Sequence, residues 1–323
     1  MTILVTGGAG YIGAHAVLAL QDSGENVVVL DNLSTGRRTM VPDGVPLVEG
    51  DVGDENLVRD ILKKYGVRSV IHFAASIVVP DSVADPLGYY LNNTVKTRSL
   101  VSACVNGGVS NFIFSSTAAV YGNAEIMPVK ESAPLAPVSP YGASKMMSER
   151  ILQDVSAAYG LKYTILRYFN VAGADPKLRA GQATKNATHL IKVAVETALG
   201  KRAQIQVYGT DYQTPDGTCV RDYIHVSDLA DFHLAALKSL QAGGENRIFN
   251  CGYGHGASVR DVIASVERVA GLKLKVVDAP RRAGDPASIV AGVSEIRAAL
   301  KITPRFGDLD TIVAHALAFE KTL

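Results

Sequence analysis

Tyr141 and Lys145 are a candidate acid–base pair, because they stand four residues apart in the segment SPYGASK at 139–145. Ser139 is a plausible N-cap and Pro140 suits the first helical position, so we expect both side chains on one face of a helix. A free phenol has a pKa of about 10, and a nearby ammonium lowers it by stabilising the phenolate. Such a pair can take a proton from a substrate hydroxyl. The same spacing also fits an ordinary Tyr–Lys pair on a helix surface.

Thr117 carries another hydroxyl that could take part in chemistry. It lies in SSTAAVYG at 115–122, at the carboxyl end of a predicted strand, which is where sites form in open α/β sheets. The hydroxyl could hydrogen-bond a substrate oxygen, or it could only cap the following turn. The sequence leaves both interpretations open.

Gly7, Gly10 and Gly13 follow the first predicted strand in the segment GGAGYIG at 7–13. Glycine lets the backbone turn tightly and come close to a pyrophosphate, which the free N–H groups at the start of the next helix then bind. The position of this loop in a strand–helix unit predicts a dinucleotide site. A tight turn without a ligand is the alternative.

Acidic residues at the ends of the next strands would complete that site. Asp31 ends the second predicted strand, where a carboxylate can accept hydrogen bonds from the adenosine ribose and repel a 2′-phosphate. We therefore expect NAD rather than NADP, although Arg37 and Arg38 would suit NADP. Asp51 and Val52 suit the adenine edge, where Asp51 could equally be a loop cap. The positive charge of an oxidised nicotinamide would further stabilise a phenolate.

The elements around these residues alternate between short apolar runs and longer amphipathic stretches. This alternation predicts an α/β fold with a doubly wound parallel sheet of the Rossmann type. The predicted strands are Thr2–Thr6, Asn26–Leu30, Pro46–Val48, Ser69–Phe73, Asn111–Ser115 and Tyr163–Tyr168. The predicted helices are Tyr11–Asp22, Glu55–Tyr65, Leu87–Gly107 and Gly142–Tyr159.

The regular alternation ends near Phe169, and polar loops that contain glycine follow. We expect an NAD-binding Rossmann domain over residues 1–170 and a smaller α/β substrate-binding domain over residues 171–323. The strand predicted at Arg247–Cys251 could return to the first sheet, so we expect an interleaved boundary.

Composition excludes several classes of function. Lys+Arg number 32 and Asp+Glu 31, which argues against binding of nucleic acid or an anionic membrane through bulk charge. The start of the chain has no signal-peptide pattern, no apolar run is long enough to span a membrane, and the cysteines form no disulfide framework. We therefore expect a cytoplasmic protein. The histidines show no ligand spacing, and we predict no metal.

Taken together, the motifs resemble those of the extended short-chain dehydrogenase/reductase superfamily and, within it, UDP-glucose 4-epimerases, over nearly the whole chain. The segments that carry the resemblance are GGAGYIG (7–13), DNLSTG (31–36), GD (50–51), HFAA (72–75), NN (92–93), SSTAAVYG (115–122), SPYGASK (139–145), LRYFNVAGA (166–174), DGTCVRDYIHVSDLAD (216–231) and RRAGDPAS (281–288). The resemblance implies an NAD-dependent enzyme that interconverts UDP-glucose and UDP-galactose at C4 through a transient 4-keto sugar.

The resemblance also implies roles for individual residues. Tyr141 would be the acid–base group, Thr117 its hydroxyl partner where many relatives have Ser, and Lys145 would bind the nicotinamide ribose. The other implied cofactor residues are Gly7, Gly10, Tyr11, Ile12, Gly13, Asp31, Asn32, Ser34, Thr35, Gly36, Asp51, Val52, Phe73, Ala74, Ala75, Asn92 and Phe169. The implied substrate residues, besides Thr117 and Tyr141, are Asn170, His189, Leu190, Gln206, Val207, Tyr208, Arg221, Arg282 and Asp285.

Arg221 and Arg282 would grip the UDP moiety, because a guanidinium fork matches phosphate oxygens. From the residues alone, both would be read as surface residues. Ile77 departs from the family pattern, since some members carry a lysine there, near the cofactor phosphates. Ile289 stands where a large aromatic residue restricts the pocket to unmodified hexoses and a small residue admits N-acetyl groups. A shift of one residue would place Ser288 there, so acceptance of UDP-N-acetylhexosamines or UDP-pentoses stays open.

Two other functions are compatible with this scaffold. A 4,6-dehydratase would carry acidic residues directly after Thr117, whereas Ala118 and Ala119 follow here. A non-catalytic NAD-binding regulator would be expected to lose the pair formed by Tyr141 and Lys145.

Two of the predicted helices are long enough to form a contact between subunits: Leu87–Gly107 and Gly142–Tyr159. The resemblance implies a homodimer in which these helices pair across a two-fold axis. The same helices could instead cover the sheet of a monomer.

Overall fold

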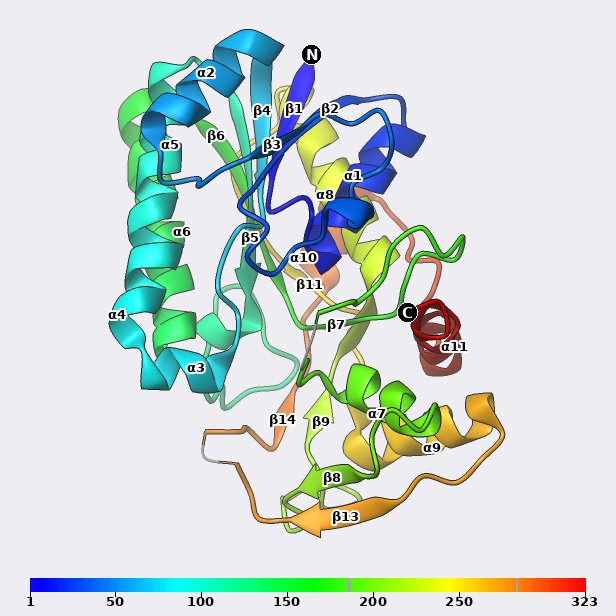
Figure 1. Cartoon of the computed structure of the whole chain (residues 1–323). Coiled ribbons are helices and arrows are strands. Elements are labelled where there is room, and N and C mark those ends of the chain that lie inside the picture. Colours follow the sequence, from blue (N-terminus) through cyan, green and yellow to red (C-terminus); the bar gives the residue numbers. More distant parts are fainter. Residues whose placement is uncertain (185–186, 283) are drawn as a thin grey trace.

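Seven parallel strands form the central sheet, in the order β11-β6-β5-β4-β1-β2-β3 (Figure 1). The structure is a computed structural model that describes residues 1–184, 187–282 and 284–323, so Ala283 of the segment 281–288 lies outside the described residues. The strands of this sheet are β1 (Thr2–Thr6), β2 (Asn26–Asp31), β3 (Leu47–Glu49), β4 (Val67–His72), β5 (Asn111–Thr117), β6 (Lys162–Tyr168) and β11 (Arg247–Cys251). Strand β5 is buried along its whole length, as a central parallel strand covered on both faces must be.

Helices cover both faces of this sheet (Figure 1). Helices α2 (Glu55–Tyr65), α5 (Lys96–Asn106) and α6 (Pro140–Tyr159) lie on one face, and helices α1 (Tyr11–Asp22) and α8 (Val226–Gln241) lie on the other. The predicted doubly wound α/β fold is therefore confirmed. Helices α1 and α2 and strands β1 and β11 have the predicted bounds, and the ends of the other predicted strands differ from the prediction by at most two residues.

The helix predicted over Leu87–Gly107 is not one regular helix. The chain forms α4 (Pro86–Tyr89), a π-helical turn, η2 (Tyr90–Val95), and then α5. The carbonyl of Asn93 in that turn accepts hydrogen bonds from the hydroxyls of Thr97 at 2.6 Å and Ser148 at 2.9 Å. The second of these donors comes from α6, so the irregular turn depends on a tertiary contact that a periodicity argument does not detect.

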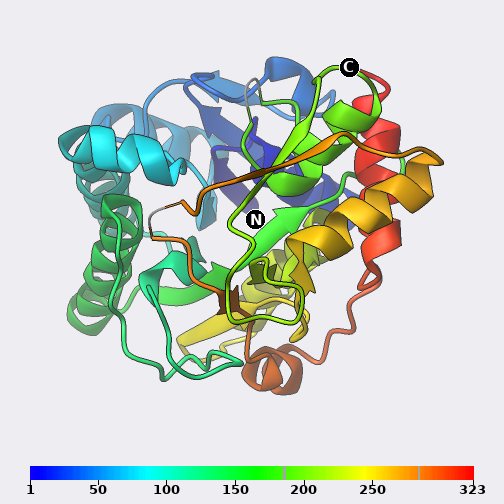
Figure 2. The same ribbon diagram turned by 90° about the horizontal axis from the view of Figure 1, so that it is seen from below.

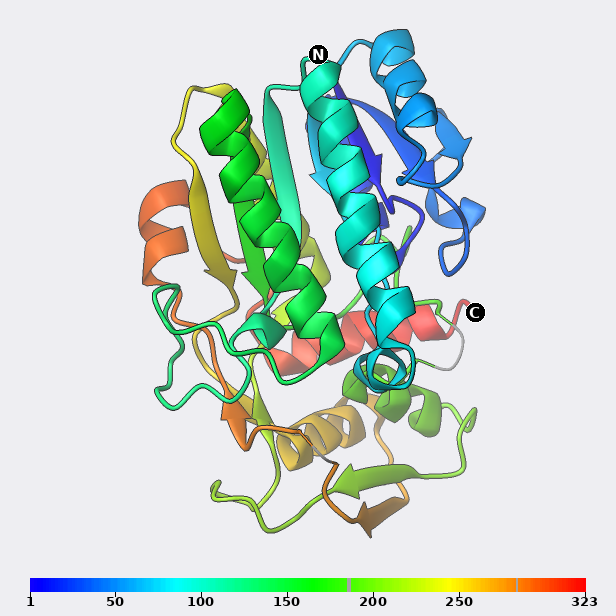
Figure 3. The same ribbon diagram turned by 90° about the vertical axis from the view of Figure 1, so that its left-hand side faces the viewer.

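The other elements lie mainly beyond the carboxyl ends of the sheet strands (Figure 3). They form three small sheets: β7 (Asn170–Ala172) with β10 (Tyr223–His225); β9 (Val220–Arg221) between β12 (Ala257–Ser258) and β14 (Ser288–Ile289); and β8 (Ile205–Tyr208) with β13 (Val276–Ala279). The remaining helices and helical turns are α3 (Val79–Ala84), α7 (Leu190–Ala198), α9 (Val259–Ala270), α10 (Ser294–Leu300), α11 (Leu309–Glu320), η1 (Arg38–Met40) and η3 (Ala118–Val120). In Figure 2, helices α9 (orange) and α11 (red) lie on the side away from α6 (green).

Strand β11 connects the two parts of the molecule. It pairs in parallel with β6 at the edge of the central sheet, although it follows β7 to β10 in the sequence. The chain therefore passes between the central sheet and the smaller sheets more than once. Within the described ranges, no helix combines the length and apolar character that a membrane span needs.

Candidate active site

The glycine loop between β1 and α1 has a backbone that requires glycine at two positions. Gly7 has a φ of +72°, and a Cβ there would lie 2.6 Å from the amide nitrogen of Ala74. A Cβ on Gly13 would lie 2.1 Å from the carbonyl oxygen of Gly7. The loop thus sits tightly against the end of β4 and opens α1, and the first N–H groups of a helix have no partner within it. This cradle fits the pyrophosphate of a dinucleotide.

Asp31 ties this loop to the end of β2. Its Oδ2 accepts a hydrogen bond from the N–H of Ala9 at 2.9 Å, and its Oδ1 accepts one from the N–H of Leu33 at 2.8 Å. The segment 32–36 is held against the same loop, because the N–H of Arg37 donates to the carbonyl of Ala9 at 2.9 Å. An ionised carboxylate has about four acceptor sites, so Asp31 keeps capacity for ribose hydroxyls.

Asp51 caps its own loop and also pairs with a lysine. Its Oδ1 accepts from the N–H of Gly53 at 2.8 Å, and its Oδ2 lies 2.5 Å from the Nζ of Lys96. Burial acts to raise the pKa of Asp51, but the hydrogen bonds from Lys96 and Gly53 outweigh burial and leave that pKa lowered. Arg38, which would suit NADP, is held in an exposed ion pair with Glu49 at 2.9 Å.

Other predicted cofactor residues surround the cradle. The Tyr11 hydroxyl, at the start of α1 beside Ile12, donates to the carbonyl of Gly173 at 2.7 Å and so connects α1 to the end of β7. Val52 is buried. In the segment 31–36, which is predicted to bind the adenosine, three residues are exposed: Asn32, Ser34 and Thr35.

The loop after β4, residues 73–75, is partly buried, and its first two residues adjoin Gly7. Asn92 connects the π-helical turn to the end of this loop, because its Nδ2 donates to the hydroxyl of Ser76 at 3.0 Å. Ile77 is 47% exposed. An apolar side chain therefore faces solvent where some family members carry a lysine.

Helix α6 brings Tyr141 and Lys145 to the carboxyl end of β5. Ser139 caps the helix by accepting a hydrogen bond from the N–H of Gly142 at 3.2 Å, and Pro140 is the first helical residue. Tyr141 is 6% exposed and Lys145 is 2% exposed. The interpretation of the two residues as an ordinary surface pair is thereby excluded.

Lys145 is held by neutral groups. Its Nζ donates to the carbonyl of Ser115 at 2.8 Å and lies 4.8 Å from the centre of the Phe114 ring. Burial lowers the pKa of Lys145 to about 7, while the charge of Glu149 acts to raise it. The protonation of this lysine at neutral pH is therefore sensitive to the groups around it.

Thr117 lies beside Tyr141 at the end of β5 and takes one of its two predicted roles, the cap of the following turn. Its Oγ1 caps the next turn by accepting from the N–H of Ala119 at 3.1 Å. Burial raises the pKa of Tyr141 to about 12, although the hydrogen bond with Thr117 acts to lower it. The protein's own groups thus leave Tyr141 protonated at neutral pH. A phenolate needs further positive charge, such as that of an oxidised nicotinamide.

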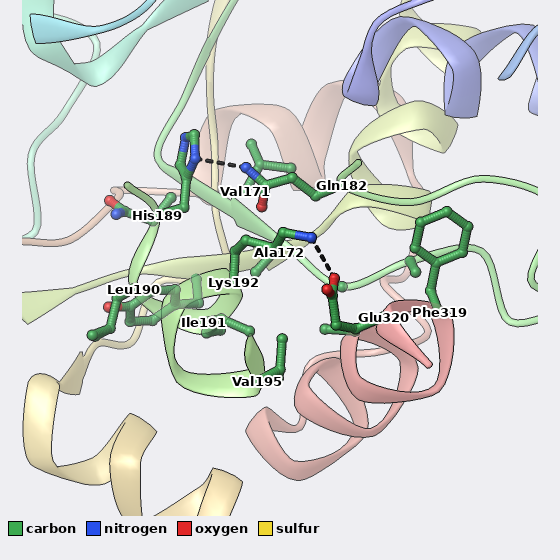
Figure 4. A pocket seen from close by; sticks show the side chains of 15 residues that line it. Val171, Ala172, Gln182, His189, Leu190, Ile191, Lys192, Val195, Phe319 and Glu320 are labelled. Carbon is green, nitrogen blue, oxygen red and sulfur yellow. Dashed lines mark hydrogen bonds and ion pairs between the residues drawn. The ribbon is translucent and has the colours of Figure 1, made fainter. Parts of the chain in front are cut away.

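Three predicted substrate residues line one small cavity of about 20 Å³ beside β7 (Figure 4). These are Asn170, on β7 itself, and His189 and Leu190, which stand at the start of α7. The Nε2 of Gln182 lies 2.6 Å from the Nδ1 of His189 and holds the ring in place. Phe169, the residue before Asn170, is buried.

A buried ion pair closes another side of the same cavity (Figure 4). The Nζ of Lys192 on α7 bonds the carboxylate of Glu320 on α11, and it also lies 3.4 Å from the carboxylate of Glu196. The pair joins α7 to the helix near the end of the chain, and it thereby fixes the helix that carries Leu190.

The predicted UDP-binding residues come together at β8, β9 and the segment before β14. The Nη2 of Arg221 lies 3.7 Å from the carboxylate of Asp285, and the guanidinium of Arg282 stacks 3.7 Å from the centre of the Tyr208 ring. Tyr208 also donates its hydroxyl to the side chain of Gln206. Val207, between these two residues, is buried in the hydrophobic core.

Ile289 and Ser288 form β14, which pairs in parallel with β9 so that Ile289 stands opposite Arg221. Ile289 is buried in the hydrophobic core, whereas Ser288 is partly exposed. Both candidates for the position that sizes the sugar pocket therefore lie next to a predicted UDP-binding residue.

Several charged residues around this site were not predicted from the sequence. Glu149 could have been found, because it follows Lys145 by four residues and so shares its helical face. Lys96, the partner of Asp51, gave no comparable signal. Lys192 and Glu320 are far apart in the sequence, and only the packing of α7 against α11 brings them together.

The fold and the site define a class of protein: a doubly wound α/β protein with a dinucleotide cradle and a buried Tyr–Lys pair at the carboxyl end of its sheet. Residues 3–252 match the NAD dependent epimerase/dehydratase family. The chain belongs to this family.

Individual relatives agree with this assignment and confirm the resemblance found in the motifs. The chain is 54% identical to the "UDP-glucose 4-epimerase" of Azospirillum brasilense over 99% of its own length and 92% of that protein. A crystal structure of UDP-glucose 4-epimerase from Brucella ovis in complex with NAD has a TM-score of 0.95 and 43% identity, covering 98% of this chain and 97% of that one. The enzyme from Bifidobacterium longum in complex with NAD+ and UDP has a TM-score of 0.94 and 36% identity, covering 100% and 98%.

Proposed function

We propose that the protein is an NAD-dependent UDP-glucose 4-epimerase, which interconverts UDP-glucose and UDP-galactose by inverting the configuration at C4. The observation that carries this proposal is the buried pair of Tyr141 and Lys145 at the same carboxyl edge of the sheet as the glycine cradle. It occurs in a chain that is 54% identical, over 99% of its length, to a UDP-glucose 4-epimerase.

The residues of this chain fit NAD at the glycine loop. A Cβ at Gly7 or Gly13 would fill the cradle, and Asp31 is placed to accept from the adenosine ribose. Lys145 would bind the nicotinamide ribose. When bound, NAD+ supplies the acceptor for the C4 hydride and a positive charge near Tyr141.

Tyr141 moves the proton in this mechanism. Its phenolate accepts the proton of the sugar's 4-hydroxyl as the C4–H bond breaks, and it returns that proton after the 4-keto sugar has turned over about its link to the pyrophosphate. Thr117 hydrogen-bonds the same oxygen, and Lys145 stabilises the phenolate. The rotation requires a firmly held nucleotide and a loosely held sugar. We assign the grip on the nucleotide to Arg221, Arg282 and their neighbours.

A dehydratase reaction is not favoured by this site. Expulsion of a C6 hydroxyl needs further acid–base groups, and the two residues after Thr117 are Ala118 and Ala119. The sugar range is a separate question, because buried Ile289 is intermediate in size between an aromatic gate and an open pocket.

The test is to incubate the purified protein with UDP-galactose and no added cofactor, and to separate the products by chromatography. We expect UDP-glucose to form until the two sugars reach equilibrium. Accumulation of a 4-keto product would favour a dehydratase, and no reaction with any of several UDP-sugars would favour a regulator. UDP-N-acetylgalactosamine and UDP-arabinose, assayed in parallel, measure the sugar range.

We further propose that the protein is a cytoplasmic homodimer. The two subunits would pair through α4, the π-helical turn η2 and α5. Leu87, Leu91 and Val95 are 80%, 54% and 51% exposed, and their spacing of four residues aligns them on one helical face. Three buried free cysteines suit a reducing compartment. Light scattering after size exclusion should give the mass of a dimer, and Leu91→Lys should shift it toward that of a monomer.

A further inference from the structure

Glu149 is a buried acid on the same helical face as Lys145. It is 1% exposed and follows Lys145 by four residues on α6. A buried carboxylate is costly unless it is paired and hydrogen-bonded. Two groups, Arg167 on β6 and Ser116 on β5, meet that need.

Arg167 binds Glu149 through a fork of hydrogen bonds. Its Nε lies 3.0 Å and 3.2 Å from the two carboxylate oxygens, and its Nη2 lies 2.5 Å from Oε2. The same guanidinium donates to the hydroxyl of Tyr121 at 2.9 Å, which in turn donates to Asn250 at 2.7 Å. Glu149 is therefore fixed by a network that spans three strands and the turn after β5.

Ser116 connects Glu149 to the segment that holds the proposed catalytic groups. Its hydroxyl donates to the Oε1 of Glu149 at 2.5 Å. The residue before it, Ser115, supplies the carbonyl that accepts from Lys145, and the residue after it is Thr117. Alternate side chains of a strand point to opposite faces, and the Ser115 hydroxyl lies 2.8 Å from His233 on the other face of the sheet. Ser116 thus adds a link between this segment and α6 to the bond of Lys145 with the Ser115 carbonyl.

We propose that Glu149 is a positioning residue for the proposed function: it fixes the Ser115–Thr117 segment against α6 and places a negative charge on the same helical face as Lys145. This inference rests on the proposed function for its catalytic meaning. The charge relation between Glu149 and Lys145 can be measured without any turnover.

The groups that face this pair come from several elements, and Glu131, in the segment before α6, lies behind Arg167 and accepts from its Nη1 through the backbone carbonyl at 3.3 Å. Lys145 faces the Phe114 ring and Ser115 carbonyl of β5, Tyr141 of α6, and His72 of β4, whose pKa burial lowers to about 3 so that it stays neutral. Glu149 faces Arg167 and Tyr163 of β6, Ser116 of β5 and Tyr121 of the following turn. Glu149 is the group whose charge raises the pKa of Lys145, against the effect of burial.

The first experiment replaces the charge with an isosteric amide, Glu149→Gln. We expect Lys145 to lose its proton at a pH about one unit lower or more, and the alkaline limb of kcat for UDP-galactose to move down by the same amount. Chemical shifts of Lys Cε in selectively 13C-labelled holoenzyme, assigned with Lys145→Met, give the titration of Lys145 directly. This readout stays informative even if the protein is not an epimerase.

Three further variants separate charge from structure. Glu149→Gln with Arg167→Gln removes both charges, so it should recover the thermal stability lost in Glu149→Gln while leaving the Lys145 titration shifted. Glu149→Asp keeps the charge and should retain most of the parental pH profile. Ser116→Ala should lower kcat about three- to tenfold without moving either pH limb, because it removes only the link between Ser116 and Glu149.

A folded Glu149→Gln protein with the parental Lys145 titration would overturn the proposal. So would a double variant in which both stability and the titration return to the parental values, because that result would assign the whole effect to an unpaired Arg167. If Glu149→Gln alone does not fold, the double variant decides the question by the same titration.

Discussion

The two ends of the proposed site are built in different ways. At the catalytic end, Tyr141, Lys145 and Glu149 are almost fully buried, and the contact of Lys145 with the Ser115 carbonyl is 2.8 Å. At the nucleotide end, Arg282 is exposed and touches the protein through a stacking contact of 3.7 Å. Packing fixes the proposed catalytic groups before substrate arrives, whereas Arg282 at the nucleotide end has few contacts that would prevent it from adjusting to a ligand.

The largest effect should come from removing the phenol at the catalytic end. Tyr141→Phe is expected to lower kcat by about 10²–10⁴-fold, the usual contribution of a positioned acid–base group. The dissociation constant for UDP, measured by calorimetry, should change little, because that grip lies at the other end. Turnover within a few-fold of the parent would contradict the role of Tyr141.

The buried ion pair of Glu149 with Arg167 should contribute strongly to the free energy of unfolding. Arg167→Met leaves Glu149 buried without its partner, since both side chains are 2–3% exposed, and it is expected to cost about 3–5 kcal/mol of unfolding free energy in urea titrations. Arg150→Met is the control for an exposed pair, because Arg150, on the helix that carries Glu149, pairs with Asp154 at 74% side-chain exposure. Equal losses in the two variants would show that burial of the pair is not what matters.

The nucleotide end should affect substrate affinity rather than turnover. Arg282→Gln removes a guanidinium proposed to bind the pyrophosphate, and KM for UDP-galactose should rise about tenfold at nearly constant kcat. Arg281→Gln is the neighbouring control, because Arg281 pairs with Asp211 at 2.7 Å. A fall in kcat at constant KM would mean that Arg282 acts in the transition state. It would contradict the assignment of substrate binding to one end of the site and chemistry to the other.

The effect of His233 is on the acid stability of the protein rather than on the reaction. Burial lowers the pKa of His233, which contacts Ser115, to about 4, against about 6.5 in an unfolded chain. Between these values the unfolded state binds more protons, so stability is full above about pH 6.5 and falls as the pH drops toward 4. In His233→Gln, the slope of unfolding free energy against pH should be smaller by the amount that corresponds to about one bound proton. Unfolding titrations at several pH values measure this slope. An unchanged slope would mean that His233 is not buried in its neutral form.

The sequence predicted the fold well where local signals decide it. The bounds of α1 and α2 and the cap of α6 at Ser139 follow from periodicity and capping chemistry. The π-helical turn at Tyr90–Val95 could not be predicted, because a hydroxyl of α6 stabilises it from outside.

In the candidate site, too, features set by local sequence could be predicted, and contacts between distant segments could not. The glycine spacing and the Tyr141–Lys145 spacing are local signals. The pairing of Glu149 with Arg167 depends instead on how β6 packs against α6, and the stacking of Arg282 on Tyr208 joins segments that are distant in the sequence.

The most direct test follows the hydrogen at C4. UDP-galactose that carries deuterium at C4 is incubated with the protein, and the UDP-glucose formed is analysed by NMR and mass spectrometry. If hydride leaves C4 and returns to the opposite face within one site while Tyr141 moves only the hydroxyl proton, the product keeps its deuterium at C4. Loss of that deuterium to solvent water would mean that C4 gives up a proton rather than a hydride, and it would contradict the proposed mechanism.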